Sequence, residues 1–125
     1  RLKGIKEWNF GLFEAQPERL QPKFRPGATS FEDLFVPYGG ESVDQVGERM
    51  LVTLTEVMEQ AGAEPVLAFS HGGAMWAFYL KIAAQALDPK VRFGNCAICH
   101  YQYEQGHFKL AEVIDPLTGS VYECE

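Results

Sequence analysis

The feature that most constrains the fold is a short apolar run that leads through a histidine and two glycines into a helix-like segment. The run is PVLAFS (65–70), the turn is HGG (71–73) and the helix-like segment is AMWAFYLKIAAQAL (74–87). The run is too short for a long helix and does not alternate between apolar and polar residues. It therefore predicts a strand covered on both faces, as in a parallel sheet.

A second pattern predicts a long helix between Gly39 and Glu64. Ser42 is the expected N-cap, Gln45 three residues later completes a capping box, and Gly62 suits the left-handed conformation that ends many helices. Apolar residues between these signals recur at helical spacing and form one face: Val43, Val46, Met50, Leu51, Leu54, Val57, Met58 and Ala61. We expect this face to pack against a sheet.

The first third of the chain has weak periodicity and many aromatic residues. Residues 1–40 predict an irregular arm with short helical turns around 16–20 and 31–35, because prolines interrupt any longer element. These prolines are Pro17, Pro22, Pro26 and Pro37.

Near the other end, residues 97–103 and 107–113 predict a β-hairpin whose three-residue loop is Glu104-Gln105-Gly106. The order helix, buried strand, helix and hairpin predicts a single α/β domain over residues 1–125. We expect a partial three-layer sandwich, with a mostly parallel sheet flanked by helices and followed by the C-terminal hairpin.

Composition narrows the class of protein. With 125 residues, 46% of them hydrophobic and 13% aromatic, the chain has material for a core. Its apolar runs are far below the ~20 residues of a membrane-spanning helix and no signal-peptide pattern is present, so we expect a soluble protein with no membrane partner. A net charge of −6 and scattered Lys and Arg predict no nucleic-acid partner, although a small anion could still bind a local pocket.

The three cysteines are too few for a secreted disulfide scaffold and favour a reducing cytoplasm. Cys96 and Cys99 have the spacing of a redox or metal motif but lie in a strand-like segment without a second pair. We expect structural thiols, no metal and no cofactor, with a metal or redox site formed with His100 as the alternative.

The histidine–glycine turn is a candidate anion site. Ligands of open α/β sheets bind beyond the carboxyl ends of strands, and the free N–H groups at a helix start favour phosphate or carboxylate. Gly72 and Gly73 would allow an anion to approach the backbone, and His71 could donate a hydrogen bond to a phosphoryl oxygen. A histidine that only caps the helix or packs in the core is the alternative.

Several segments together resemble the histidine phosphatase superfamily, the phosphoglycerate mutase-like proteins. IKEWNFGLFEA (5–15) resembles the family's Leu-x-Glu-x-x-Phe-Gly-x-x-Glu-Gly segment, GGES (39–42) its Gly-Glu-Ser loop, and FSHGG (69–73) its second catalytic-histidine motif. The segment 93–115 is similar to the family's closing hairpin. These motifs occur in the family's order over nearly the whole chain.

The resemblance implies a role for each motif. Glu7 would be the general acid or base, and His71 would stabilise the transferring phosphoryl group, with Gly72 and Gly73 beside it. Trp8 and Asn9 would line the substrate entrance, with packing as the alternative for Trp8. Two glutamates would support the site: Glu14 as a structural carboxylate, and Glu41 either at the pocket or only at the helix N-terminus. Ala15 departs from the family's glycine.

One family motif is absent from this sequence. The family forms a phosphohistidine on an Arg-His-Gly histidine, and the remaining histidines here, His100 and His107, lie in the predicted hairpin as edge or surface residues. The arginines of the chain are poor substitutes for the family's phosphate clamp: Arg25, Arg92 and Arg49, the last expected to be solvent-facing or ion-paired.

The sequence thus predicts a truncated portion of a phosphomonoester phosphatase, inactive by itself, whose nucleophile lies outside the chain. Phosphatase is favoured over mutase because residues 16–40 offer only a modest lid against water. The expected partner is a small phosphorylated metabolite or inorganic phosphate, and an uncovered sheet could also lead to self-association. The alternative is a non-catalytic anion-binding or interaction module of the same fold.

Overall fold

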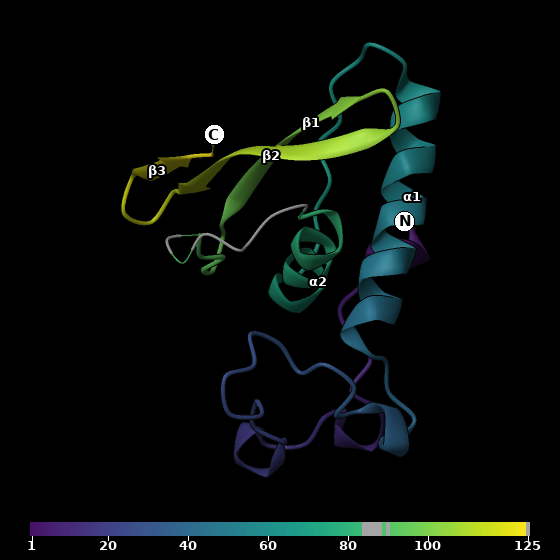
Figure 1. Cartoon of the computed structure of the whole chain (residues 1–125), viewed down its shortest axis with the longest axis vertical. Coiled ribbons are helices and arrows are strands. Elements are labelled where there is room, and N and C mark those ends of the chain that lie inside the picture. The colour runs from purple at the N-terminus through teal and green to yellow at the C-terminus, as the bar shows by residue number, and fades with distance from the viewer. Residues whose placement is uncertain (84–88, 90, 125) are drawn as a thin grey trace.

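The computed structural model describes residues 1–83, 89 and 91–124. Two α-helices and a three-stranded sheet follow a long irregular arm (Figure 1). The regular elements are α1 (Val43–Ala61), α2 (Gly72–Ile82), β1 (Ile98–Glu104), β2 (His107–Asp115) and β3 (Ser120–Glu123). Four 3-10 turns lie before α1: η1 (Lys3–Ile5), η2 (Gly11–Phe13), η3 (Glu18–Leu20) and η4 (Val36–Tyr38).

Helix α1 begins and ends at the residues that the sequence predicted. The Ser42 hydroxyl accepts from the Gln45 N–H at 3.1 Å, and the Gln45 side chain accepts from the Ser42 N–H at 2.9 Å, which is a complete capping box. Gly62 ends the helix with a positive φ of 63°, although its ψ of −116° lies outside the left-handed helical region. The predicted helix is confirmed. Its start and stop signals act between residues only a few positions apart, so the sequence alone reveals them.

The sheet is entirely antiparallel, in the order β1-β2-β3, so the predicted mostly parallel sheet is wrong. Residues 65–70, expected to be a buried strand, are extended but belong to no strand in the described part of the chain. Leu67 is 77% exposed and Phe69 is 83% exposed. An apolar run becomes a buried strand only when neighbours pair with both of its edges; here the sheet is built from the C-terminal third instead.

The predicted hairpin is confirmed, with a tighter turn than expected. Glu104 pairs with His107, which leaves Gln105 and Gly106 as a two-residue loop with φ of 51° and 78°. Two consecutive positive φ angles are those of a type I′ turn, whose twist matches that of paired strands. Strand β3, which pairs with the second half of β2, was not predicted because its four residues give too short a pattern.

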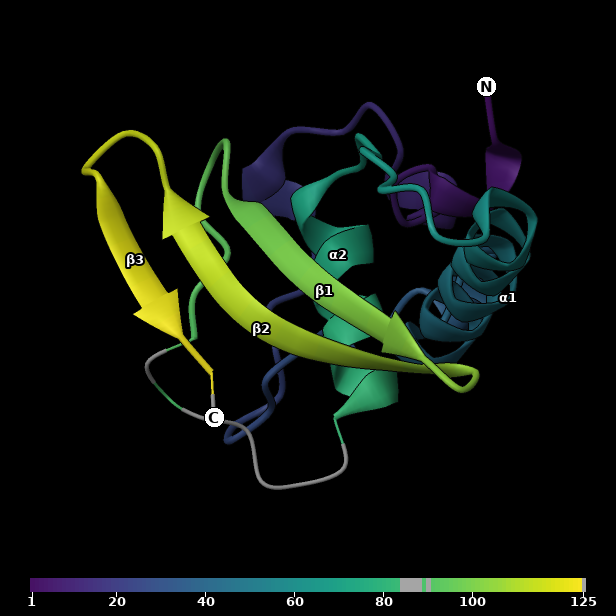
Figure 2. The same ribbon diagram turned by 90° about the horizontal axis from the view of Figure 1, so that it is seen from above.

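Helix α2 packs against α1 on one side and the sheet on another (Figures 1 and 2). Phe78 of α2 contacts Tyr101 and Phe108 edge-on, at ring-centroid distances of 5.1 and 5.3 Å. Gly47 allows the two helices to approach, since a Cβ there would lie 2.8 Å from the Ala77 carbonyl oxygen. We expected α1 to pack on a sheet, whereas its close neighbour is α2. The predicted end of α2 near residue 87 lies outside the described residues.

The main core joins the arm to the two helices. Its buried members are Trp8, Phe35, Val46, Met50, Ala74, Ala77 and Phe78, and a smaller cluster under the sheet contains Val91, Leu110 and Val113. In the arm, edge-on aromatic contacts link Phe35 to Phe13 and Phe31. The predicted turn around 16–20 is present as η3, and 32–35 form turns. Aromatic packing therefore orders an arm that has little regular backbone structure.

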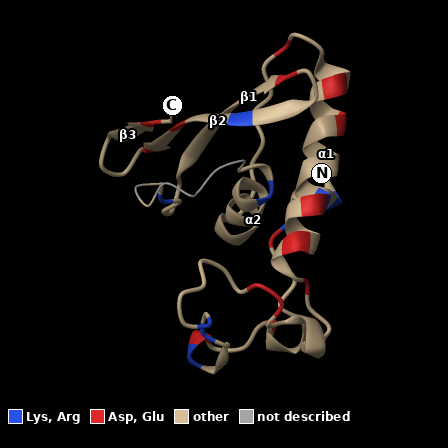
Figure 3. Cartoon of the chain, in the orientation of Figure 1, with Lys and Arg blue, Asp and Glu red and all other residues tan. Residues whose placement is uncertain are grey.

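Charges are unevenly distributed over the helices. Several acidic residues lie along α1, whereas Lys and Arg are dispersed over the chain (Figure 3). Lys81 of α2 meets two of these acids, Asp44 at 2.8 Å and Glu48 at 3.2 Å. Both described helices are too short or too polar to cross a lipid bilayer.

Candidate active site

Glu7 lies against the first turn of α2, next to the histidine–glycine motif. Its Oε1 atom accepts from the N–H groups of Trp8 at 2.9 Å and Ala74 at 2.8 Å, and Oε2 accepts from Gly73 at 3.4 Å. The N–H groups at a helix start have no partner within the helix and attract negative charge. The carboxylate therefore occupies part of the anion site that the sequence predicted at this turn.

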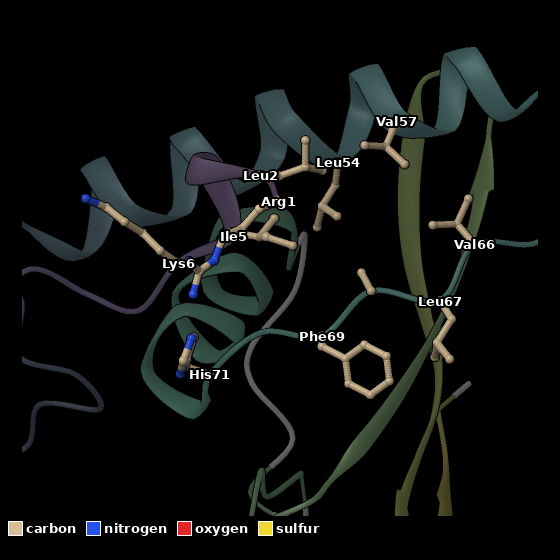
Figure 4. Close-up of a pocket in the computed structure, with 11 residues that line it drawn as sticks. Arg1, Leu2, Ile5, Lys6, Leu54, Val57, Val66, Leu67, Phe69 and His71 are labelled. Atoms are coloured by element: carbon tan, nitrogen blue, oxygen red, sulfur yellow. The ribbon is translucent and has the colours of Figure 1, made fainter.

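His71 is the residue immediately before α2. Its backbone is extended, with φ of −131° and ψ of 157°, and its side chain makes no capping hydrogen bond. The imidazole is exposed and lines a groove with Arg1 and Lys6 (Figure 4). The alternative of a helix-capping or core histidine is therefore wrong, and both ring nitrogens are available to a ligand.

The two glycines of the motif have different surroundings. A Cβ on Gly73 would lie 2.8 Å from Glu7 Oε1, so a larger residue would displace the carboxylate. Gly72 has open space where its Cβ would be. Gly73 is thus needed for the approach of Glu7, while Gly72 leaves the helix start accessible.

Two cavities meet at Lys6. The groove that His71 lines has a volume of about 520 Å³, and its walls are mostly apolar side chains of α1 and of residues 66–69 (Figure 4). The second cavity, of about 430 Å³, contains Glu7 with Trp8, Asn9, Phe10 and Glu14. Lys6 lines both and is exposed, so it can attract an anion to either.

The residues after Glu7 hold the loop in shape. Asn9 Oδ1 accepts from the Gly11 N–H at 2.9 Å, and Glu14 Oε1 accepts from the Phe10 N–H at 2.8 Å. Trp8 is 3% exposed and its indole N–H donates to the Glu41 carbonyl oxygen at 2.7 Å. The structural role expected for Glu14 is confirmed, and Trp8 has the packing role that was its alternative, although its edge also lines the cavity.

Glu41 and Arg49 form a part-buried ion pair beneath this loop. Arg49 Nε lies 2.8 Å from Glu41 Oε2, and the two side chains are 19% and 20% exposed. Burial opposes ionisation of Glu41, but hydrogen bonds from Arg49 and the Asn9 amide, with attraction to Arg49 and Lys6, outweigh it and lower its pKa. Glu41 thus supports the site and does not act only at the helix N-terminus.

The other candidate cations are engaged away from Glu7. Arg25 pairs with Asp33 at 2.7 Å, and Arg92 donates to the Val91 carbonyl oxygen. The sequence does not identify Lys6 as an anion-binding residue, because a single lysine beside the motif gives no pattern. It becomes a candidate only because it lines both cavities.

The hairpin residues show no metal site in the part of the chain that the structure describes. Burial raises the pKa of Cys99 to about 12, which keeps it a thiol. His100 lies on the edge strand β1 and contacts Glu112 at 3.1 Å, while His107 is exposed at the start of β2. Both histidines have the edge or surface positions that were expected.

The chain belongs to the histidine phosphatase superfamily (branch 1), whose family model matches residues 1–116. A curated relative from Arabidopsis thaliana, described as a metal-independent phosphoserine phosphatase, is 31% identical over 93 residues, which are 74% of this chain. The match spans 37% of that relative's length. No solved structure matches significantly.

Proposed function

We propose that this chain carries part of the active site of a phosphomonoester phosphatase that works through a phosphohistidine. The observation that carries the proposal is the contact of the Glu7 carboxylate with the first turn of α2, beside His71. A carboxyl group bound at a helix start, with an imidazole on the residue just before that helix, is suited to holding and protonating a phosphoryl oxygen. Membership of the superfamily and the relative's description support the same reaction class.

The reaction has two steps. A histidine outside this chain attacks phosphorus, the bond from phosphorus to the ester oxygen breaks, and Glu7 gives that oxygen its proton. Water then attacks the phosphohistidine, the phosphorus–nitrogen bond breaks and inorganic phosphate leaves, while Glu7 takes the proton from the water. Of the two carboxyl oxygens, Oε2 makes only the long 3.4 Å contact with Gly73 among the described residues, and it is therefore the one assigned to carry the transferred proton.

His71, Lys6 and the open face at Gly72 have binding roles in this scheme. His71 donates to an equatorial phosphoryl oxygen, and Lys6 draws the anion toward the junction of the cavities. Asn9 and the exposed edge of Trp8 contact the rest of the substrate. The scheme needs no metal ion, in keeping with the description of the relative.

The proposed substrate is a small phosphorylated metabolite, and phosphoserine is the first to test because of the relative's description. Phosphatase is favoured over mutase because a mutase must shield its intermediate from water, and the irregular arm leaves His71 and Lys6 exposed. We further propose a cytoplasmic location, which the low and odd number of cysteines supports.

Labelling the full-length gene product tests this function. After incubation with a ³²P-labelled phosphomonoester, we expect acid-labile phosphohistidine on the full-length product and none on residues 1–125 alone. Absence of label on both would instead support the non-catalytic anion-binding module.

The role of Glu7 is tested by leaving-group dependence. E7Q is expected to lower kcat/KM for phosphoserine, which reports the first phosphoryl transfer and not the later hydrolysis, about 10²–10⁴-fold, the usual contribution of general acid catalysis. It should affect kcat/KM for p-nitrophenyl phosphate much less, because nitrophenolate leaves without a proton. E18Q, an exposed carboxylate of the arm, is the control. An equal loss on both substrates would contradict the acid role.

We also propose that residues 65–70 mediate self-association with a second copy of this chain. The segment is extended, and Leu67 and Phe69 present exposed apolar side chains on it. Such a segment can pair with another strand and bury both side chains. L67K should shift sedimentation of the chain toward monomer, whereas L12K, at an equally exposed leucine of η2, should not. A 14.0 kDa monomer at all concentrations would contradict the proposal.

A further inference from the structure

The backbone that carries Glu7 is held by one side chain of α1, forty-two residues away. Arg49 Nη1 donates to the carbonyl oxygens of Gly4 at 2.8 Å and Lys6 at 2.9 Å, and Nη2 donates to that of Glu7 at 3.0 Å. A guanidinium has five N–H groups in a fixed plane and can make such a set of bonds, which an ammonium cannot match.

The same guanidinium fixes the other end of the segment through Glu41. Nε and Nη2 of Arg49 donate to the two carboxylate oxygens of Glu41 at 2.8 and 3.0 Å, and Glu41 Oε1 accepts from the Asn9 N–H at 3.0 Å. The Glu41 N–H donates in turn to the Asn9 carbonyl oxygen at 2.8 Å. Residues on both sides of Glu7 are thus tied to one ion pair.

The opposite side of the segment is held by the loop that precedes α2. The Ser70 hydroxyl donates to the Ile5 carbonyl oxygen at 2.7 Å, so the carbonyl groups of residues 4 to 7 all accept a side-chain hydrogen bond. Gly4 also lies tightly on α1, where a Cβ would overlap the Thr53 side chain. The segment has no regular backbone pairing, and its position depends on these donors.

We propose that Arg49 is a positioning residue that sets the place of the Glu7 carboxyl at the start of α2. The inference rests on the proposed function, in which Glu7 transfers the proton. Arg49 is 19% exposed and spends its donors on the backbone and on Glu41, so it acts through Glu7 and does not clamp phosphate as an exposed arginine would. A displacement of about 1 Å at a reacting group can lower a rate about 10²-fold.

The test uses the full-length gene product with phosphoserine. R49M should lower kcat about 10²-fold and change KM less than threefold, because the substrate does not touch Arg49. R49M alone leaves the part-buried Glu41 carboxylate without its ion-pair partner, which could itself destabilise the protein. The double variant R49M/E41Q is therefore measured as well, because it removes both charges. K81M is the matched control, since it removes an α1–α2 ion pair that does not touch residues 4–9, and it should leave kcat unchanged.

A double-mutant cycle separates positioning from general stability. If Arg49 acts through Glu7, then E7Q/R49M is no slower than E7Q alone. R49K keeps the positive charge but not the planar set of N–H donors, so its kcat should still be much lower than that of the wild type. The Ala74 amide hydrogen should also exchange with solvent faster in R49K than in the wild type.

The outcomes distinguish a failure of the positioning role of Arg49 from a failure of the proposed function. A folded R49M/E41Q with kcat within threefold of the wild type, full additivity of E7Q and R49M, or an unchanged Ala74 exchange rate in R49K would overturn the positioning role. Full activity of E7Q would instead overturn the proposed function, because Glu7 would then not be the acid.

Discussion

Two segments that belong to no strand reach the start of α2, and they differ in how their backbone polar groups are satisfied. Residues 4–9 form no sheet, yet their carbonyl groups accept hydrogen bonds from Arg49 and Ser70, and Trp8 is buried. Residues 65–70 also form no strand, but Leu67 and Phe69 are exposed and no strand pairs with the segment in the described chain. An irregular segment is held in one position when side chains form hydrogen bonds with its backbone N–H and C=O groups. Its own secondary-structure propensity does not fix that position.

The comparison also explains how the carboxyl group of Glu7, the proposed acid, is held in place. A loop glutamate is normally solvated and variable in position, whereas the Glu7 segment is fixed to α1, to the Glu41 loop and to the start of α2. Such support gives a loop the precision that a functional site requires.

The largest effect is expected from removing the aromatic anchor of the held segment. W8A should destabilise the protein by about 3–5 kcal/mol, because it deletes a buried side chain and leaves a cavity. Urea denaturation measures this difference. L12A, at a leucine that is 76% exposed in the same arm, should stay within about 0.5 kcal/mol, and equal losses from the two variants would break the comparison.

A smaller loss is expected where the loop after Glu7 turns. G11A should cost about 2–3 kcal/mol, since φ is 59° and a Cβ would lie 2.1 Å from the Tyr38 carbonyl oxygen. Gly27 has a similar φ of 77° but open space around its Cβ, so G27A isolates the cost of φ at about 1 kcal/mol. Thermal or urea unfolding that gave the same loss for both would show that the close contact is unimportant.

The ion pair beneath the loop should make stability depend on acid pH. The pKa of Glu41 is below its ordinary value of 4.5 in the folded state, so its contribution is complete above that pH and is lost as pH falls through the lower folded value. E41Q should cost about 1–2 kcal/mol at pH 7, as expected for hydrogen bonds to a charged group.

Urea midpoints measured at several pH values check this sign. The difference between the wild type and E41Q should shrink as the solution is made more acidic than pH 4.5. E56Q, at an exposed glutamate of α1, should show no such dependence. A difference that grew in acid would contradict the assigned direction.

The smallest effect is a gain. Ala15 has φ of 59°, in the left-handed region that costs a non-glycine residue about 1–2 kcal/mol, so A15G should stabilise the protein by about 0.5 kcal/mol after the greater freedom of unfolded glycine is subtracted. Precise thermal unfolding would detect the gain. A61G, at the last residue of α1, should have the opposite sign. A loss from A15G would mean that the Ala15 methyl group packs favourably.

Much of the local structure could be predicted from the sequence. The capping box of Ser42, the stop at Gly62 and the hairpin around Gln105 and Gly106 depend on residues a few positions apart. The departure at Ala15 was also visible, and the structure shows that the loop keeps a positive φ there without glycine. Glu7 and His71 were found through the motif resemblance, and the structure places Glu7 within 3 Å of the helix start that follows His71.

The sheet and the support of the site could not be predicted in this way. Residues 65–70 have the composition of a buried strand, but pairing needs partners that composition does not supply. Arg49 looked like a solvent-facing or ion-paired helix residue, and its bonds to the carbonyl groups of residues 4, 6 and 7 span more than forty positions.

The sequence by itself therefore determined the ends of α1 and the hairpin, because capping, turn geometry and apolar periodicity act between near neighbours. It suggested Glu7 and His71 only through the resemblance to the family. Only the tertiary structure decided that the sheet is antiparallel, that Lys6 lies between two cavities and that Arg49 holds the segment of Glu7. Those features depend on which distant groups meet, and a hydrogen bond across forty residues leaves no periodic signal in the chain.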